Sequence, residues 1–175
     1  MQIFGVKPFG EPAVDLRQYL PGFILLALLA EAYGKGGHVA AGLTVLAEAL
    51  ATADRTGERF HEAELYRLKG ELTVQSQGPD PQSQASSTPH LILSPQATAE
   101  AEACFHKALA IARRQQAKSL ELRATMSLTR LWQHQGKKEE ARQLVDEFYG
   151  WFTEGFDTKD LQEAQALLAE LEARL

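Results

Sequence analysis

Two stretches of this 175-residue chain look alike, and this internal similarity constrains the fold more than any other feature. Residues 26–54 and 125–148 each have an apolar-patterned helix, a glycine-bearing turn and a second apolar-patterned helix. A single helix pair of this size cannot bury its apolar face, so such pairs stack on one another. The similarity therefore predicts an all-α protein of stacked antiparallel helix pairs.

A third copy lies between them, interrupted by an insertion. Tyr33 and Thr73 are 40 positions apart, as are Ala101 and Ala141, whereas Thr73 and Trp132 are 59 apart, so one insertion of 19 residues falls inside the second unit. The matching positions are Leu26, Leu29, Ala30, Tyr33, Gly42, Leu46 and Ala49 in the first unit, Tyr66, Gly70, Thr73, Ala101, Phe105 and Ala108 in the second, and Thr125, Leu128, Thr129, Trp132, Ala141, Val145 and Phe148 in the third.

This order of large, small and aromatic residues resembles the tetratricopeptide repeat. The resemblance implies a right-handed superhelical array of antiparallel helix pairs, with about three units of 40-residue period and a C-terminal capping helix. Residues 1–20 are then an N-terminal extension or the stub of a preceding repeat, 21–157 hold the repeats, and 158–175 form the capping helix. The usual proline after the second helix is replaced by Asp54, Arg113 and Thr153, so these helices are expected to run longer than in the 34-residue repeat.

The insertion spans residues 76–94 and is rich in proline, serine and glutamine. Such a segment buries too little apolar surface to offset its ordering entropy, which predicts a mobile loop. Alternatively, residues 90–93 fold back over a groove. The insertion ends in Ser94-Pro95, where serine caps the next helix and proline takes its first position.

The two ends of the array differ. The aromatic residues of 149–156 are expected to seat the final helix, capped by Asp157 or Thr158, or else to form an exposed docking patch. That helix carries an apolar face of Leu161, Ala164, Leu167, Leu168 and Leu171. The first unit lacks a polar cap, which indicates that an upstream element or a partner covers it. Residues 22–30 also have the apolar character of an export signal, but the preceding stretch is not basic.

Four runs resemble the carboxy-terminal helical repeats of large bacterial signalling proteins. They are residues 28–35, 63–72, 117–135 and 149–161. In that family a cyclase domain, a kinase or a transcription regulator precedes an AAA-type regulatory ATPase and then such repeats. The resemblance covers about residues 16–175 and implies a detached or truncated sensor arm of a cytoplasmic signal-transduction ATPase. None of the family's catalytic motifs has a counterpart here, so no catalytic residue is carried over.

The residues themselves indicate no enzyme, cofactor or metal site. There is no phosphate-binding loop, no nucleophile elbow and no paired-histidine spacing on a helix. Cys104 is interpreted as a packing residue and the five histidines as solvated. With a net charge of −5 the chain has no general attraction for nucleic acid or anionic membranes. The expected partner is therefore another protein or peptide, or the rest of a larger signalling ATPase.

The first helix of each unit is expected to line a partner-binding groove. Its residues are Glu31 and Lys35 in the first unit, Glu64, Arg67, Glu71 and Gln75 in the second, and Arg123, Arg130, Gln133 and His134 in the third. This places acidic residues toward the first units and basic residues toward the third, which suits a charged peptide or helix. Reversing the charge of Arg123 and Arg130 is expected to weaken a partner without loss of helicity.

Three alternatives to this groove remain open at this point. The first is that these side chains form a solvated face without a partner. The second is a small-ligand-sensing regulatory domain, and the third is an uncharacterised helical enzyme.

Overall fold

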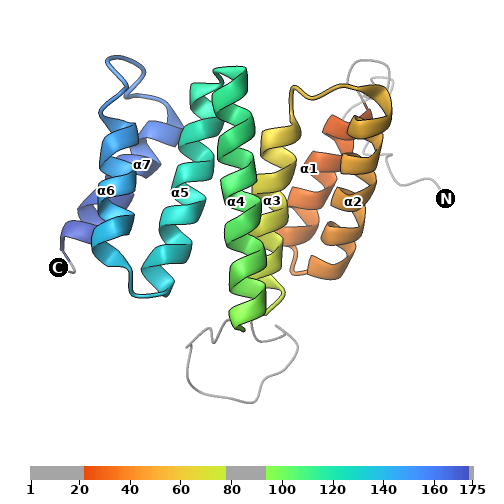
Figure 1. Ribbon diagram of the computed structural model, residues 1–175, viewed down its shortest axis with the longest axis horizontal. Helices are drawn as coiled ribbons and strands as arrows, with labels where there is room; N and C mark the ends of the chain where they lie inside the picture. Colours follow the sequence, from red (N-terminus) through yellow and green to blue (C-terminus); the bar gives the residue numbers. More distant parts are fainter. Residues whose placement is uncertain (1–21, 78–93, 174–175) are drawn as a thin grey trace, which may run out of the picture.

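The computed structural model describes residues 22–77 and 94–173, which form seven α-helices and no strand. The helices are α1 (Gly22–Lys35), α2 (Val39–Thr56), α3 (Glu62–Gln75), α4 (Pro95–Gln115), α5 (Lys118–His134), α6 (Lys138–Tyr149) and α7 (Lys159–Glu172) (Figure 1). The all-α prediction is confirmed for this part of the chain. The expected N-terminal extension, residues 1–20, and the possible cover at 90–93 lie outside the described residues.

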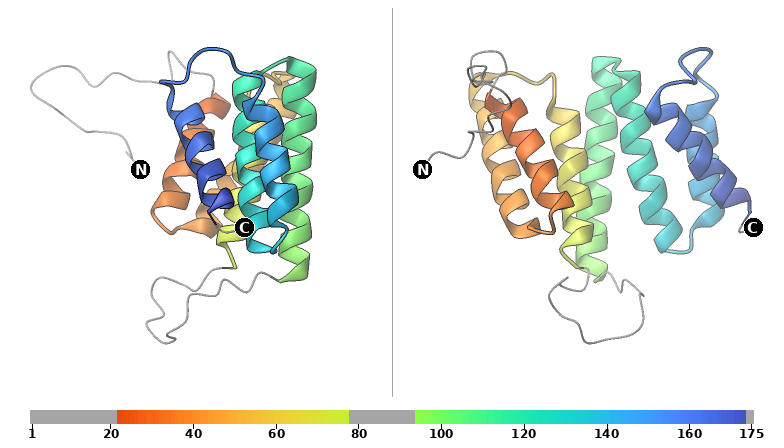
Figure 2. Two further views of the ribbon diagram at one scale, coloured as in Figure 1. Left: turned by 90° about the vertical axis from the view of Figure 1, so that its left-hand side faces the viewer. Right: turned by 180° about the vertical axis from the view of Figure 1, so that it is seen from behind.

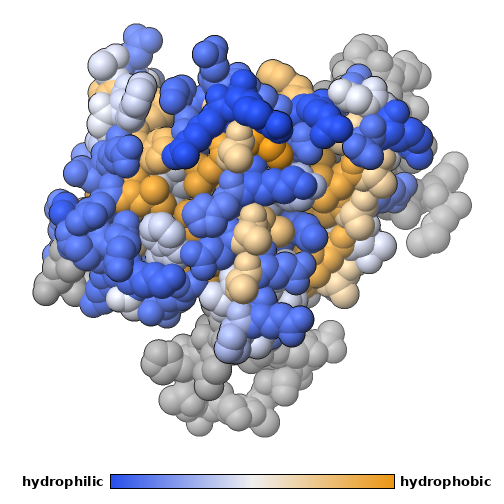
Figure 3. Space-filling model, viewed as in Figure 1, coloured by the Kyte–Doolittle hydropathy of each residue, from blue (hydrophilic) through white to orange (hydrophobic). Residues whose placement is uncertain are grey.

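The helices alternate between two layers. Each helix packs against the next, and α1, α3, α5 and α7 also contact one another in that order. Figure 2 shows α1 and α7 on one side of the molecule and α4 on the other. The first helices of the three pairs therefore share one layer with α7, and α2, α4 and α6 form the second layer. The face of that second layer shows apolar side chains on both sides of α4 (Figure 3).

Most of the repeat positions of the sequence are buried in the structure, and the others, Leu26, Leu29, Tyr33, Tyr66 and Trp132, are half-buried. In the second helix of every unit the three positions are buried, and so are Ala30, Gly70 and Thr129 in the first helices. The buried positions are Gly42, Leu46 and Ala49 in α2, Ala101, Phe105 and Ala108 in α4, and Ala141, Val145 and Phe148 in α6. The 40-residue spacing thus predicted which faces of these helices turn inward.

Gly70 marks a close approach between the paired helices α3 and α4. A Cβ atom added there would lie 2.5 Å from Cε1 of Phe105 and 2.8 Å from its Cδ1. The equivalent positions hold Ala30 with Leu46 in the first unit and Thr129 with Val145 in the third. A smaller residue on the first helix therefore goes with a larger one on the second.

Three helices end in the same hydrogen-bonded turn. His38 N donates to Tyr33 O at 2.9 Å, Lys137 N to Trp132 O at 2.9 Å, and Ala117 N to Ala112 O at 3.0 Å. The left-handed residue in these turns is Gly37, Gly136 or Gln116. The predicted glycine-bearing turns of units one and three are confirmed, and α4 makes the same turn without glycine.

Replacing Gln116 with glycine is expected to stabilise the protein by about 0.5–1 kcal/mol. Gln116 has φ 55°, a conformation that costs an L-residue energy and costs glycine little. Ala110→Gly, at an exposed helical position of α4, is the control and should destabilise by about 1 kcal/mol. Urea unfolding followed by circular dichroism measures both changes, and a destabilised Gln116→Gly variant would contradict the expectation.

Two buried hydroxyls in α5 have no hydrogen-bond partner among the described residues. They are Thr125 Oγ1 and Thr129 Oγ1, and both residues are fully buried. Thr73, a buried threonine on the first-layer helix α3, instead donates its hydroxyl to Lys69 O at 2.8 Å.

Thr129→Val is expected to raise stability by about 1 kcal/mol, because it removes a desolvated hydroxyl and keeps the branched shape. Thr73→Val is the matched control and should not stabilise, since it removes a satisfied hydrogen bond. Thermal unfolding of the two variants measures the difference. Equal shifts would show that the α5 hydroxyl carries no desolvation penalty.

The insertion and the helix ends agree only in part with the sequence predictions. Ser94 caps α4 as predicted, accepting from Ala97 N at 3.2 Å with Pro95 at the first helical position. Of the predicted loop, Ser76 caps the end of α3 and Gln77 lies in a turn, while 78–93 lie outside the described residues. α2 and α4 run past Asp54 and Arg113 as expected. The extension of α6 to residue 153 is wrong, because α6 ends at Tyr149 before Gly150.

The predicted apolar face of the final helix is confirmed, and Thr158 stands at its N-cap position as predicted, but its side chain makes no cap bond. Leu161, Ala164, Leu167 and Leu171 of α7 pack into one core with α5 and α6, and Leu168 is half-buried against it. Thr158 precedes the helix, yet its hydroxyl donates to Gly155 O at 2.7 Å and accepts no helix amide.

Two of the aromatic residues of 149–156 seat the final helix, and two others are exposed, as a docking patch would require. Tyr149 and Phe152 pack against the core that α7 closes, as expected of a seat for the final helix. Trp151 and Phe156 remain exposed. Lys118 Nζ lies 4.5 Å from the centre of the Trp151 ring.

Candidate functional site: a charged cleft across four helices

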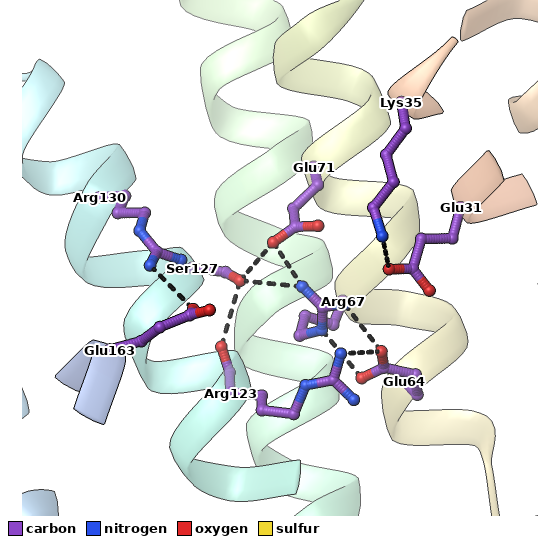
Figure 4. Close-up of polar contacts among 9 residues, drawn as sticks. All are labelled: Glu31, Lys35, Glu64, Arg67, Glu71, Arg123, Ser127, Arg130 and Glu163. Carbon is purple, nitrogen blue, oxygen red and sulfur yellow. Dashed lines mark hydrogen bonds and ion pairs between the residues drawn. The ribbon is translucent and has the colours of Figure 1, made fainter. Parts of the chain in front are cut away.

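The layer of α1, α3, α5 and α7 carries a polar cleft of about 190 Å³. We use "polar cleft" for the residues that line it: Glu31, Lys35, Arg67, Glu71, Arg123, Met126, Arg130, Lys159, Asp160 and Glu163. Nine of the ten are ionisable, and they come from four helices. Figure 4 shows ion pairs within α1 and α3, between α3 and α5, and between α5 and α7.

Arg67 is the buried centre of this arrangement. Its side chain is 8% exposed, and its Nε and Nη2 donate to the two oxygens of Glu64 at 2.8 and 2.7 Å. Its Nη1 contacts Glu71 on the next turn of α3. Burial alone would lower the pKa of Arg67, but the hydrogen bond and charge of Glu64, with the charges of Glu71 and Glu31, raise the pKa above its ordinary value. Arg67 is therefore a fixed cation held by carboxylates.

The same network joins α3 to α5. Ser127 Oγ donates to Glu71 Oε1 at 2.8 Å, and Arg123 Nη2 lies 3.0 Å from Glu64 Oε1. Because Glu64 is 13% exposed, it is nearly enclosed by its two arginines. These contacts fix how α3 and α5 lie against each other.

The two sides of the polar cleft carry more exposed ion pairs. On α1, Lys35 Nζ lies 2.7 Å from Glu31 Oε1. The hydrogen bond from Lys35 is the main reason why the pKa of Glu31 falls below its usual value. Between α5 and α7, Arg130 Nη2 lies 3.5 Å from Glu163 Oε2, and Lys159 Nζ approaches the other oxygen of Glu163 at 3.6 Å.

Of the ten predicted groove residues, the structure brings six to the polar cleft: Glu31, Lys35, Arg67, Glu71, Arg123 and Arg130. Glu64 lies beneath them through its bonds to the arginines. Gln75 instead donates to Gly34 O at 2.9 Å, and Gln133 donates to Glu170 at 3.1 Å, so both link neighbouring first-layer helices. His134 is exposed at the last residue of α5.

The predicted separation of charge is corrected by the pairing. The acidic residues of α3 and the basic residues of α5 do lie on different helices, but Arg123 binds Glu64 and Arg67 lies among the carboxylates of α3. The charges neutralise one another at short range, so the face does not present an acidic half and a basic half. The prediction that Arg123 can be reversed without loss of helicity stays a prediction, but a glutamate there would face the nearly buried Glu64 and is expected to destabilise the protein.

Sequence reasoning missed the α7 side of the polar cleft. Lys159, Asp160 and Glu163 belong to a helix that we had treated only as a cap. A signal was present, because α7 follows α6 as α5 follows α4 and so occupies a first-layer position. Ser127 was also missed, since nothing in its spacing distinguishes it from a solvated serine.

A second hollow, of about 300 Å³, lies between α2, α3 and α4. Arg59 lies in it between Asp54, at 3.0 Å, and Glu62, at 3.2 Å. Across it, Lys107 Nζ donates to the Tyr66 hydroxyl at 2.6 Å. The polar groups of this hollow are also paired with one another.

Cys104 and the histidines were also considered in the sequence analysis. Cys104 is buried, and burial raises the pKa of its thiol, as expected of a packing residue. His38, His106 and His134 are exposed. Within residues 22–77 and 94–173 no group of three or more histidine, cysteine, aspartate or glutamate side chains is placed to bind a metal ion. Of the helices in these ranges, none combines the length and apolarity needed to cross a membrane.

Comparisons with protein-family models, with curated proteins and with solved structures find no match to this chain.

Proposed function

We propose that this protein is an interaction module of the tetratricopeptide type, in which the polar cleft receives a peptide or helix from a partner protein. The observation that carries the proposal is the polar cleft itself, where four first-layer helices contribute to one continuous surface. A surface built from one helix per unit is how stacked helix pairs form extended binding sites. The alternating layers and the Gly70–Phe105 approach support the tetratricopeptide-like superhelix.

The charges of the polar cleft indicate the chemistry of the partner. Arg67 and Glu64 are buried and occupied by each other, so they hold the scaffold. Arg130, Lys159 and Glu163 are partly or largely exposed and lie at 3.5 Å or more from one another, so they can exchange partners. A peptide with alternating acidic and basic residues satisfies these groups pair by pair. In this proposal the chain is a sensor or scaffold arm of a larger cytoplasmic signalling ATPase, as the resemblance implies.

A small-ligand sensor is less well supported. Ligand pockets usually enclose about 300–1,000 Å³ and are mainly apolar. The polar cleft has about 190 Å³, and Met126 is its one apolar residue. The second hollow reaches about 300 Å³, but four of its seven lining residues are charged: Asp54, Arg59, Glu62 and Lys107. The ionisable groups of the polar cleft form acid–base pairs across helices, an arrangement that suits surface recognition better than enclosure of a metabolite.

Selection from a displayed random-peptide library on the immobilised full chain tests the proposal. Recovered peptides should contain both acidic and basic residues, and Arg130→Glu with Lys159→Glu should weaken their binding at least roughly tenfold. Arg114→Glu is the control, because Arg114 is exposed on α4 in the other layer. Circular dichroism checks that each variant keeps its helicity. If no peptide is selected, or if the control weakens binding equally, the polar cleft is not a peptide site.

A further inference from the structure

The first helix is apolar on nearly all sides. In the fourteen residues of α1 the charged residues are Glu31 and Lys35, and both belong to the polar cleft. A helix with apolar residues all round is normally buried on all sides. Within the described ranges α1 packs against α2 and α3, and Leu28 is left 53% exposed.

The internal repeat allows the exposed side of α1 to be compared with the corresponding side of α3. The second unit follows the first by 40 positions, so Leu25, Leu28 and Ala32 are the counterparts of Leu65, Leu68 and Leu72 on α3. Those three leucines are at most 4% exposed and pack into the core formed with the preceding helix pair. We call Leu25, Leu28 and Ala32 the α1 end face.

The helix that receives the α3 leucines has a simple pattern. The shared core contains Leu46, Ala49 and Ala53 of α2, a large apolar residue followed by alanines three and seven positions later. The same spacing recurs on α4 as Phe105, Ala108 and Ala112, which are all buried. Phe105 and Ala108 share a core with α5, and Ala112 lies in a smaller cluster with Ala63 of α3, against which Leu120 of α5 packs. The pattern on the receiving helix is thus repeated within this chain.

We propose that the α1 end face is a docking surface for an amphipathic helix of a partner protein, one that presents a large apolar residue and two alanines at the spacing of Leu46, Ala49 and Ala53. The surface is separate from the polar cleft, and the inference does not depend on the function proposed for that cleft. The opposite end of the molecule does not supply such a helix: α7 exposes Ala166, Ala169 and Ala173 at this spacing, so the large apolar residue is missing, and Gln162 and Gln165 are exposed beside them. A head-to-tail contact between copies is therefore disfavoured.

The test uses the α2 sequence as the probe. A fluorescein-labelled, end-capped peptide of residues 38–56 is titrated with the full chain and followed by anisotropy. The peptide is expected to bind saturably, and Leu28→Glu in the protein should weaken binding at least roughly tenfold. A peptide with Ala49→Glu should lose binding to the same extent, because the charge falls within its apolar stripe.

Phe60→Ser is the matched protein control. Phe60 is 71% exposed in the connection between α2 and α3, so its loss removes apolar surface elsewhere and should leave peptide binding unchanged. Equal weakening by Phe60→Ser, or no binding of the α2 peptide to the wild-type chain, overturns the proposal. Sedimentation velocity provides a further decision: a wild-type dimer that Leu28→Glu converts to a monomer would assign the surface to a second copy and overturn the proposal as well.

Discussion

Gly70→Ala is expected to destabilise the protein by about 2 kcal/mol and to lower its melting temperature by roughly 4–8 °C. Helix propensity alone predicts the opposite sign, because alanine is favoured over glycine inside a helix by about 1 kcal/mol. The structure decides the sign, since the new Cβ would lie 2.5–2.9 Å from three ring atoms of buried Phe105. Thermal and urea unfolding measure the change.

The repeat itself supplies the control for this experiment. The first unit has Ala30 and Leu46 at the positions of Gly70 and Phe105, so Phe105→Leu should make room for the alanine. The double variant is expected to be more stable than the sum of the two single changes predicts. Strict additivity would show that the close approach of α3 and α4 at this point is not the cause.

Arg67→Met is expected to cost about 3 kcal/mol of stability, the loss typical of removing one partner from a buried ion pair. Methionine fills similar space, but it leaves Glu64 and Glu71 without the cation that bridges them. Arg67→Lys should not restore the loss, because an ammonium group cannot donate to both oxygens of Glu64 in the geometry that the guanidinium adopts. Urea unfolding at neutral pH provides the measurement.

Arg130→Met is the matched control on the same face. Its partner Glu163 lies 3.5 Å away and both side chains are more than 40% exposed, so the expected change is at most about 1 kcal/mol. Adding Glu71→Gln to Arg67→Met should recover part of the lost stability, because Glu71 has then lost its ion-pair partner, whereas Glu64 keeps Arg123. If the two arginines cost the same, Arg67 is not the buried centre of the network.

The sequence predicted the helices and their buried faces because both follow from local spacing. Apolar residues at helical intervals, glycine at Gly37 and Gly136, and the Ser94 cap are properties of neighbouring residues. The 40-residue period then made it possible to assign the buried positions of the other units from those of the first. The end of α6 was misjudged because a helix can end without a proline: glycine is a poor helix former, and α6 stops before Gly150.

The polar cleft was predicted less completely because its contacts depend on how neighbouring helices are rotated. The sequence placed Arg67 and Arg123 on first-layer helices, but it could not show that both reach the same carboxylate of Glu64. A shift of one turn between α3 and α5 would have produced the separated charges that we expected. The contribution of α7 was missed because its sequence shows only that one face is apolar and the other polar. A capping helix and a helix that lines a cleft both have this pattern.

The layered contacts also determine the order in which the molecule opens. Each helix touches its neighbour, and α1, α3, α5 and α7 also touch one another in that order, so the ends can separate while the middle stays folded. The two ends are unequal, because α7 closes one with a buried leucine face and α1 leaves Leu28 in solvent at the other. Amide protons of α1 and α2 should therefore exchange with deuterium before those of α6 and α7, with α3–α5 exchanging last. A helix docked on α1 would slow amide exchange in α1 and α2 but not at the other end. The exchange rate of this helix pair would therefore report how much of the α1 end face is occupied.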